Sequence, residues 1–211
     1  MLIKFKIAGN LCYLSHTETM NMFIRACVRA GLNLRYSRGF NPRPKISLPM
    51  PRSVGVEAGN ELLVVQIQDE KSDLDIDQFK VNLAERLPNG CDLLDVNVTL
   101  SKKSIQPEQL EYLMTIRNEF LDENLKDRIE NLMARKTLNI ERKVKKTHRF
   151  RTIDVRAFLV SVEINGNNII VQCKVSNTGT IRVDEILRLL ELDAHKLSSP
   201  VRRTNIKWSS N

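Results

Sequence analysis

Hydrophobic and polar residues alternate strictly at the start of the chain. The apolar residues are Ile3, Phe5 and Ile7, and the residues between them are Lys4 and Lys6. Because neighbouring side chains of a β-strand point to opposite faces, this period of two predicts a strand with one buried face. We therefore expect a strand over residues 2–9.

The pattern then changes to the spacing of a helix. Ser15 and Glu18 form an S-x-x-E capping box, in which each side chain hydrogen-bonds a free backbone amide at the start of a helix. Gly31 is a stop signal, since glycine readily adopts the left-handed conformation that ends many helices. The apolar residues between these signals recur every three or four positions: Met20, Phe23, Ile24, Cys27 and Val28.

Three more strands and a second helix complete the first half. A nearly continuous apolar run predicts a strand over residues 61–68, and a shorter strand is expected within residues 45–48. The second helix is marked by Ile76, Phe79, Leu83 and Leu87, and the last strand by Leu94, Val96, Val98 and Leu100. A Pro-Asn-Gly turn at residues 88–90 separates them. The order β-α-β-β-α-β over residues 1–103 is that of a ferredoxin-like domain, an antiparallel sheet with helices on one face.

The second half is predicted to repeat this order without repeating the sequence. A hairpin is expected around Asn165 and Gly166, a strong turn signal, and Asp154 is expected to cap a short helical turn. The remaining strands are predicted at 111–118, 137–144 and 201–208, and the helices around Leu125, Ile129, Leu132 and Met133 and over residues 184–192. With an insertion between the second and third strands, these elements give β-α-β-β-α-β over residues 110–211. The predicted fold class is α+β, two tandem ferredoxin-like domains joined by a linker at residues 101–109.

The composition is typical of a globular protein and argues against a disordered, membrane-spanning or secreted one. The 211 residues are 42% hydrophobic and 27% charged, which argues against wholesale disorder. No apolar run is long enough for a membrane span, and the N-terminal residues lack the apolar core of a signal peptide. Scattered cysteines predict reduced thiols in a cytoplasmic protein: Cys12, Cys27, Cys91 and Cys173.

Sequence motifs that hold cofactors or metals are absent. There is no C-x-x-C, C-x-x-x-C-x-x-C, P-loop, G-x-G-x-x-G, H-E-x-x-H or G-x-S-x-G, and the three histidines are dispersed. We therefore expect no cofactor and no metal. His16, at the start of the first helix, is the one weak catalytic candidate. It either packs against the following loop, contacts a phosphate, or acts as a general acid or base.

Charge is distributed unevenly along the chain. Residues 1–56 carry nine basic residues and one acid, and residues 141–211 carry fourteen basic residues and seven acids. The middle, residues 57–140, holds ten basic residues and seventeen acids. Two basic regions that flank an acidic one suggest an anionic partner, most often nucleic acid.

The segment at residues 36–51 concentrates this charge in a restricted backbone. It contains four prolines, one glycine, three basic residues and no acid. Prolines hold the residues before them extended, so the loop loses little conformational entropy when it presents its cations. A rigid structural crossover is the alternative interpretation, and Phe40 is expected either to anchor the loop to the core or to stack on a base. The candidate anion-binding residues are Arg35, Ser37, Arg38, Asn41, Arg43, Lys45 and Arg52, and the loop-shaping residues are Gly39, Phe40, Pro42 and Pro44.

A second basic segment, residues 141–151, holds six lysines and arginines beside one acid. Its alternation suits an extended ribbon with one cationic face that contacts phosphates. A solvated hairpin without a ligand explains the same pattern equally well. The candidate residues are Lys143, Lys145, Lys146, Arg149 and Arg151.

Several of these motifs together resemble the radical SAM-linked protein family, a bacterial domain of unknown function. They are "LSH" at residues 14–16, "YSRGFNPRPKISL" at 36–48, the prolines at 49 and 51, and "VGVEAGNE" at 54–61, with a weaker continuation at 152–164. The resemblance implies a domain fused to, or encoded beside, a radical SAM enzyme. It also implies a gene neighbourhood of RNA processing and the ribosome, and the family has no established catalytic residues to carry over to this chain.

These observations support three hypotheses for function. The first is an accessory, non-catalytic partner of a radical SAM enzyme that binds RNA or an RNA-containing substrate through the basic loop. The second is a metal-independent ribonuclease resembling the RNA-processing enzymes of CRISPR systems, with His16 as acid or base and Lys45 or Arg38 stabilising the phosphorane. The third is an adaptor that docks the radical SAM subunit without nucleic acid.

Overall fold

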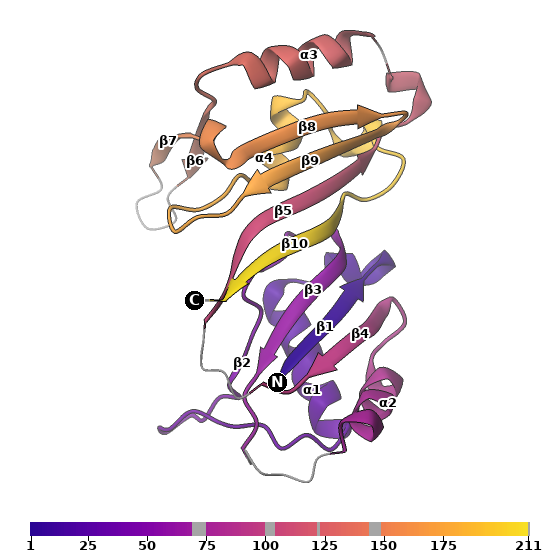
Figure 1. The fold of residues 1–211 in the computed structure, drawn as a ribbon, viewed down its shortest axis with the longest axis vertical. Helices are drawn as coiled ribbons and strands as arrows, with labels where there is room; N and C mark the ends of the chain where they lie inside the picture. Colours follow the sequence, from indigo (N-terminus) through magenta and orange to yellow (C-terminus); the bar gives the residue numbers. More distant parts are fainter. Residues whose placement is uncertain (69–74, 100–103, 122, 144–148, 211) are drawn as a thin grey trace. The chain divides into compact units, whose positions relative to one another are not determined.

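The computed structural model describes residues 1–68, 75–99, 104–121, 123–143 and 149–210 (Figure 1). Over these residues the fold is mixed α+β, with four α-helices and mostly antiparallel strands. The chain divides into two compact units: unit 1 comprises residues 1–106 and 208–211, and unit 2 comprises residues 107–207. None of the described helices is long and apolar enough to cross a membrane.

Unit 1 contains an antiparallel sheet and two helices. Its strands lie in the order β4-β1-β3-β2, and every pair of neighbours is antiparallel. Along the chain the elements are β1 (Leu2–Ile7), the 3-10 helix η1 (Gly9–Tyr13), α1 (His16–Arg29), β2 (Ile46–Ser47), β3 (Glu57–Val65), α2 (Ile76–Arg86) and β4 (Cys91–Asn97). The strands and helices predicted for this half are present, including the short strand within residues 45–48.

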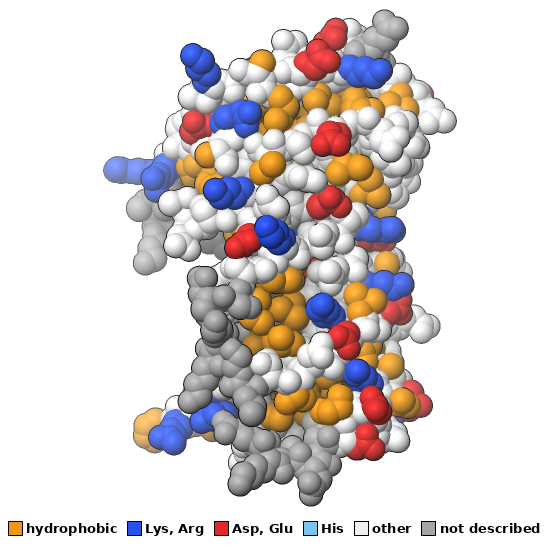
Figure 2. All heavy atoms as spheres, in the orientation of Figure 1, with side chains coloured by type: hydrophobic (Ala, Val, Ile, Leu, Met, Phe, Trp, Pro, Cys, Tyr) orange, Lys and Arg blue, Asp and Glu red, His pale blue; other side chains and the backbone are white. Residues whose placement is uncertain are grey.

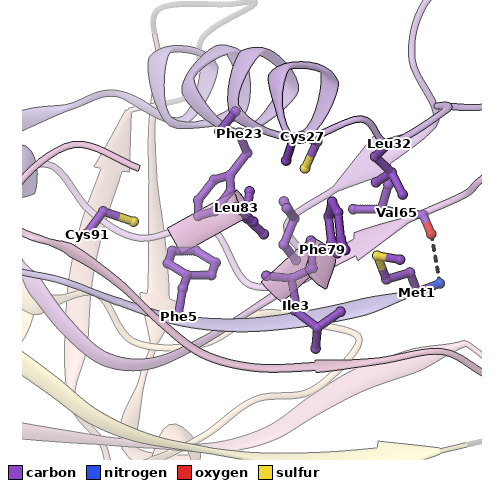
Figure 3. Close-up of a cluster of buried hydrophobic side chains, with 14 of the residues drawn as sticks. Met1, Ile3, Phe5, Phe23, Cys27, Leu32, Val65, Phe79, Leu83 and Cys91 are labelled. Atoms are coloured by element: carbon purple, nitrogen blue, oxygen red, sulfur yellow. Dashed lines mark hydrogen bonds between the residues drawn. The ribbon is translucent and has the colours of Figure 1, made fainter. Parts of the chain in front are cut away.

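The core of unit 1 follows from the alternation of β1 and the apolar stripe of α1. Ile3, Phe5 and Ile7 are fully buried, while the lysines between them are exposed. Phe5 contacts Phe23 of α1, with 4.4 Å between the ring centroids (Figure 3). The N-terminal amine of the chain donates a hydrogen bond to the carbonyl of Val65 at 2.9 Å, which ties the start of β1 to the end of β3.

The predicted capping box begins α1. The Ser15 hydroxyl accepts a hydrogen bond from the Glu18 amide at 3.3 Å, and the Glu18 carboxylate accepts one from the Ser15 amide at 2.8 Å. These hydrogen bonds hold the pKa of Glu18 below its ordinary value. Gly31 follows the helix with φ +87°, as predicted for a stop signal. Val28, expected in the apolar stripe, is exposed at its margin.

Strand β4 differs from its prediction. Of the four alternating residues, Val96 is buried, but Leu94 and Val98 are exposed. In the pairing with β1 the register shifts: Asp95 lies opposite Lys4 and Leu93 opposite Phe5, so Leu94 is an extra residue without a partner. Such a β-bulge reverses the alternation of faces at Leu94, and Val98 lies past the last residue of β4, so a strict period of two fails here. Leu100 lies outside the described residues.

Unit 2 contains four neighbouring strands of the larger sheet and a separate hairpin. The four strands lie in the order β10-β5-β9-β8, while β6 and β7 pair only with each other among the described strands. The elements are β5 (Ile105–Thr115), η2 (Asn118–Phe120), α3 (Glu123–Ala134), β6 (Asn139–Lys143), β7 (Phe150–Asp154), η3 (Arg156–Phe158), β8 (Leu159–Asn165), β9 (Asn168–Lys174), α4 (Val183–Leu189), η4 (Ala194–Lys196) and β10 (Arg202–Ser210).

The insertion in this half precedes the second strand of the larger sheet. The pair β6–β7 follows α3 directly, before β8 and β9, whereas the sequence suggested an insertion after the second strand. Extended apolar patterns do not reveal which sheet a strand joins, which explains the difference. The predicted hairpin at Asn165 and Gly166 is present, with Gly166 at φ +59°. The N-cap position of η3 is Val155 rather than Asp154, but the Asp154 carboxylate, one residue earlier, accepts a hydrogen bond from the Arg156 amide at 3.0 Å.

Candidate nucleic-acid interface

Residues 35–45 form a hairpin that projects from unit 1 between α1 and β2 (the purple segment in Figure 1); we call it the basic hairpin. The amide of Lys45 donates to the carbonyl of Arg35 at 2.7 Å. Gln66, just after β3, donates to the carbonyl of Lys45 at 2.9 Å and accepts from the amide of Arg35 at 2.8 Å. Both stems of the hairpin are therefore fixed to the sheet of unit 1.

The tip is closed by a second set of hydrogen bonds. The amide of Ser37 donates to the carbonyl of Arg43 at 2.8 Å, and the amide of Arg43 donates to the Ser37 hydroxyl at 2.9 Å. Gly39 has φ +137°, a conformation that residues with a Cβ rarely adopt. Phe40 has an exposed fraction of 106%, so its ring is not anchored to the core. Of the two expectations for Phe40, anchoring the loop is therefore wrong.

The cations of the hairpin are open to water. In the part of the chain that the structure describes, no carboxylate forms an ion pair with Arg38, Arg43 or Lys45. Hydrophobic and basic side chains project together from this segment in Figure 2. The predicted residues that are exposed on the hairpin are Arg35, Arg38, Gly39, Phe40, Asn41, Pro42, Arg43 and Lys45, while Pro44 pairs with Tyr36 and is half-buried.

Arg52 has a different environment from the hairpin arginines. Its guanidinium donates hydrogen bonds to the backbone carbonyls of Leu11, Cys12, Leu14, Ser53 and Val56. These carbonyls belong to η1, to the residue before the Ser15 cap, and to the segment that leads into β3. Arg52 therefore joins two separate stretches of unit 1, residues 11–14 and 53–56, and the donors it uses there are not available to a phosphate.

A small pocket lies next to Arg52. Its cavity volume is about 10 Å³, roughly room for one water molecule. The lining residues are Phe5, Ile7, Leu14, His16, Thr19, Leu48, Arg52 and Glu61. His16 is the first residue of α1, as predicted, and is exposed. The pocket thus brings together residues from the "LSH", "ISL" and "VGVEAGNE" motifs, which are far apart in the sequence.

The thiols and carboxylates near this pocket are buried. Burial raises the pKa of the Cys12 thiol, an effect that the positive charge of Arg52 opposes and the negative charge of Glu57 reinforces. The Glu57 carboxylate accepts a hydrogen bond from the Gly9 amide at 3.0 Å. Elsewhere in the chain, burial raises the pKa of the thiols of Cys27 and Cys91 in unit 1, and of Cys173 in unit 2, to about 12. Among the described residues, no three His, Cys, Asp or Glu side chains gather in an arrangement that could hold a metal ion.

The pairing of β6 with β7 places the cations of the second basic segment on different faces of the hairpin. Lys143 lies opposite Phe150, and Arg142 lies opposite Arg151, so Lys143 and Arg151 belong to opposite faces of the β6–β7 hairpin. The prediction of one cationic face is therefore wrong for these two residues. Arg149 is exposed just before β7, and Lys145 and Lys146 lie outside the described residues.

The sequence matches the family described as "Uncharacterized protein conserved in bacteria (DUF2344)" over residues 1–186. The chain belongs to this family. The matched region of the DUF2344 protein includes the basic hairpin, the pocket and the β6–β7 hairpin, and it ends inside α4. No curated protein matches the sequence.

Two lining residues of the pocket in this DUF2344 protein were not predicted from the sequence. Thr19 is buried in the first turns of α1 and donates its hydroxyl hydrogen to the Ser15 carbonyl at 2.9 Å. Glu61 is buried within β3. A threonine on a helix and a glutamate in an apolar strand carry no motif of their own. The one signal for Glu61 is its place at the end of the "VGVEAGNE" stretch.

Proposed function

We propose that this DUF2344 protein binds RNA through the basic hairpin and acts as a non-catalytic accessory to a radical SAM enzyme. The RNA-binding part rests on one observation, the hydrogen-bonded tip that exposes Phe40 between Arg38 and Arg43. Arginines contribute affinity through phosphate contacts, and an exposed aromatic ring provides a stacking surface for a base. Because the stems are already ordered, little conformational entropy is lost on binding.

The enzyme partner and the fold family are further parts of this proposal. The partner is supported by the resemblance of residues 14–16, 36–48 and 54–61 to radical SAM-linked proteins. Two ferredoxin-like domains are supported by the strand orders β4-β1-β3-β2 and β10-β5-β9-β8, which follow one scheme. A cytoplasmic location is supported by four free cysteines, as expected in a reducing compartment.

A salt titration tests the RNA-binding part. We expect the full chain to bind a short labelled single-stranded RNA in fluorescence anisotropy, with log K falling linearly against log[salt] at a slope of about −2 for three phosphate contacts. The double variant Arg38→Ala/Arg43→Ala should weaken binding about tenfold at low salt and reduce the slope by about 1 to 2.

The matched control is Arg25→Ala/Arg29→Ala. Both arginines are exposed on α1, so this variant loses the same charge from the same unit without touching the hairpin. We expect its affinity to stay within about twofold of wild type, since distant charges are screened. Equal losses in the two double variants would show that net charge, not the hairpin, binds RNA, and an absence of saturable, salt-sensitive binding would reject RNA altogether.

Co-purification from the native cell tests the accessory part. A radical SAM enzyme recovered only without nuclease treatment supports an RNA-dependent association, whereas recovery after nuclease treatment supports docking by protein contacts. Recovery of no such enzyme under either condition rejects the accessory role. RNA cleavage by the purified chain that is lost in His16→Ala would replace both roles with a ribonuclease.

A further inference from the structure

The tip of the basic hairpin exposes a hydrophobic ring, Phe40, which contributes nothing to binding a phosphate. Phe40 is the most exposed large hydrophobic residue of the described chain, at 106%, compared with 66% for Phe150 and 63% for Tyr13. Single exposed apolar residues are common on protein surfaces and need no explanation by themselves. This one is held at the end of an ordered hairpin, with arginines on both sides.

We infer that the basic hairpin recognises an unpaired nucleotide, whose base stacks on Phe40 and whose neighbouring phosphates contact Arg38 and Arg43. This inference rests on the proposed RNA binding and deepens it. It assigns a chemical class to the ligand, an unstacked base in a single strand, loop or bulge, rather than RNA in general.

The hydrogen bonds of the tip hold the backbone that carries these three side chains. Ser37 and Arg43 are joined by two hydrogen bonds at 2.8 and 2.9 Å, so the loop between them is short and closed. Arg38 follows one stem and Arg43 begins the other, and Phe40 lies between them in the sequence. A base on the ring therefore has a cation on each side along the hairpin, which matches the alternation of base and phosphate in an extended nucleic-acid strand.

A paired duplex does not fit this tip. Bases inside a duplex have both faces covered by their neighbours, and the major groove of A-form RNA is too deep and narrow for side chains to read. A duplex would meet only the arginines and leave the ring in water. An unpaired base offers a free face, and stacking on an aromatic side chain is tolerant of base identity.

A lipid surface is the other ligand that suits an aromatic ring beside cations. One ring adds a small apolar contribution, and stable membrane attachment takes more than one weak signal. Unpaired RNA uses both the ring and the cations, so it accounts for more of the observed features. Vesicle binding is therefore included in the test as an outcome against the inference.

The test compares three labelled RNAs of equal phosphate number in fluorescence anisotropy: a single strand, a fully paired duplex, and a duplex with one bulged nucleotide. We expect wild type to bind the single strand and the bulged duplex about tenfold more tightly than the paired duplex, as one stacked base allows. Phe40→Leu, which keeps apolar character but removes the flat ring, should bind all three alike. Phe40→Tyr should keep the preference, and Val28→Ala, at another exposed apolar site in unit 1, should behave as wild type.

A spectroscopic measurement reports stacking directly. Phe40→Trp gives the chain a second tryptophan in addition to Trp208. Unpaired RNA should quench the emission of the added tryptophan and leave the emission of wild type unchanged. Equal affinity of wild type for paired and unpaired RNA, or a preference that survives in Phe40→Leu, would overturn the inference while RNA binding stands. Failure to bind any RNA rejects the proposed function as well. A blue shift of Phe40→Trp on phosphatidylserine-containing vesicles, without quenching by RNA, would assign the tip to lipid and overturn the inference.

Discussion

The basic hairpin of unit 1 and the β6–β7 hairpin of unit 2 both come from strongly basic stretches, yet they use their cations differently. In the first, Arg38 and Arg43 are exposed beside an exposed ring. In the second, Arg142 is turned inward, and Lys143 and Arg151 lie on opposite faces. Local charge density therefore does not identify an anion site. The pairing register and the neighbouring acids decide which cations remain available.

Arg142 is the clearest case of a cation with a structural role. Its guanidinium donates to both carboxylate oxygens of Glu185, at 2.7 and 2.8 Å, and to the carbonyl of Thr180 at 2.7 Å. Glu185 also accepts a hydrogen bond from the amide of Arg182 at 2.8 Å. The hydrogen bonds that Arg142 donates to the Glu185 carboxylate raise the pKa of Arg142 above its ordinary value. This ion pair connects the β6–β7 hairpin to the start of α4.

The largest expected effect is therefore on stability, in unit 2. Arg142→Ala should lower the free energy of unfolding by about 3 kcal/mol, because it leaves the Glu185 carboxylate, 4% exposed, without its cation. Urea unfolding followed by circular dichroism measures the change. Arg151→Ala, an exposed arginine opposite Arg142 on the same hairpin, should change stability by less than about 0.5 kcal/mol. Similar losses in the two variants would contradict the structural role assigned to the ion pair.

The second prediction compares the two hairpins as RNA ligands. Lys143→Ala/Arg151→Ala removes the same charge as Arg38→Ala/Arg43→Ala but from two opposite faces of one ribbon. We expect it to weaken binding to single-stranded RNA by about twofold, against about tenfold for the hairpin-tip variant, because cations on opposite faces do not contact one strand together. Anisotropy titrations at one salt concentration measure both. A larger loss in the unit 2 variant would reverse the comparison and move the interface to β6–β7.

Local signals along the sequence predicted much of the fold. The alternation of β1, the Ser15–Glu18 capping box and the Asn165-Gly166 turn each depend on residues close together in the chain, and each is present in the structure. The bulge at Leu94 was not predictable, because it arises from pairing with β1 rather than from the composition of β4. The placement of β6–β7 outside the larger sheet is likewise a property of pairing.

The candidate site was predictable only in part for the same physical reason. The proline-rich pattern correctly indicated an ordered loop, but the exposure of Phe40 depends on how the two stems close. Arg52 was grouped with the hairpin arginines by charge, whereas its environment is set by carbonyls from residues 11–14 and 53–56. Contacts that span about 40 positions leave no local pattern.

A smaller effect is expected from the neutral hydrogen bond that closes the basic hairpin. Ser37→Ala removes the hydroxyl that accepts from the Arg43 amide at 2.9 Å. The free energy of opening the hairpin tip should fall by about 0.5 to 1 kcal/mol, since one exposed neutral hydrogen bond contributes little. Hydrogen exchange should show faster exchange of the Arg43 amide, with RNA affinity reduced about two- to threefold. Unchanged exchange at that amide would mean that the stems alone hold the tip.

The smallest expected effect concerns pH. It distinguishes a charged hydrogen-bond acceptor, the Asp154 carboxylate at the end of β7, from a neutral one, the Ser37 hydroxyl that closes the basic hairpin. An oxygen of the Asp154 carboxylate accepts from the amides of Leu138 and Arg156 at 2.8 and 3.0 Å, and these hydrogen bonds hold the pKa of Asp154 below its ordinary value. A carboxyl group with a lowered folded-state pKa stabilises the fold above its unfolded pKa, about 4, and loses that effect as pH falls through the folded value.

Asp154→Asn keeps an oxygen acceptor but removes the charge. Its melting temperature should therefore be slightly lower than that of wild type at neutral pH, and this difference should shrink as the pH falls well below about 4. Thermal unfolding by circular dichroism at the two pH values measures it. Ser37→Ala is the matched comparison: it removes an uncharged acceptor, so its difference from wild type should not depend on pH. A constant difference for Asp154→Asn would show that the amides of Leu138 and Arg156 do not distinguish a carboxylate from an amide oxygen.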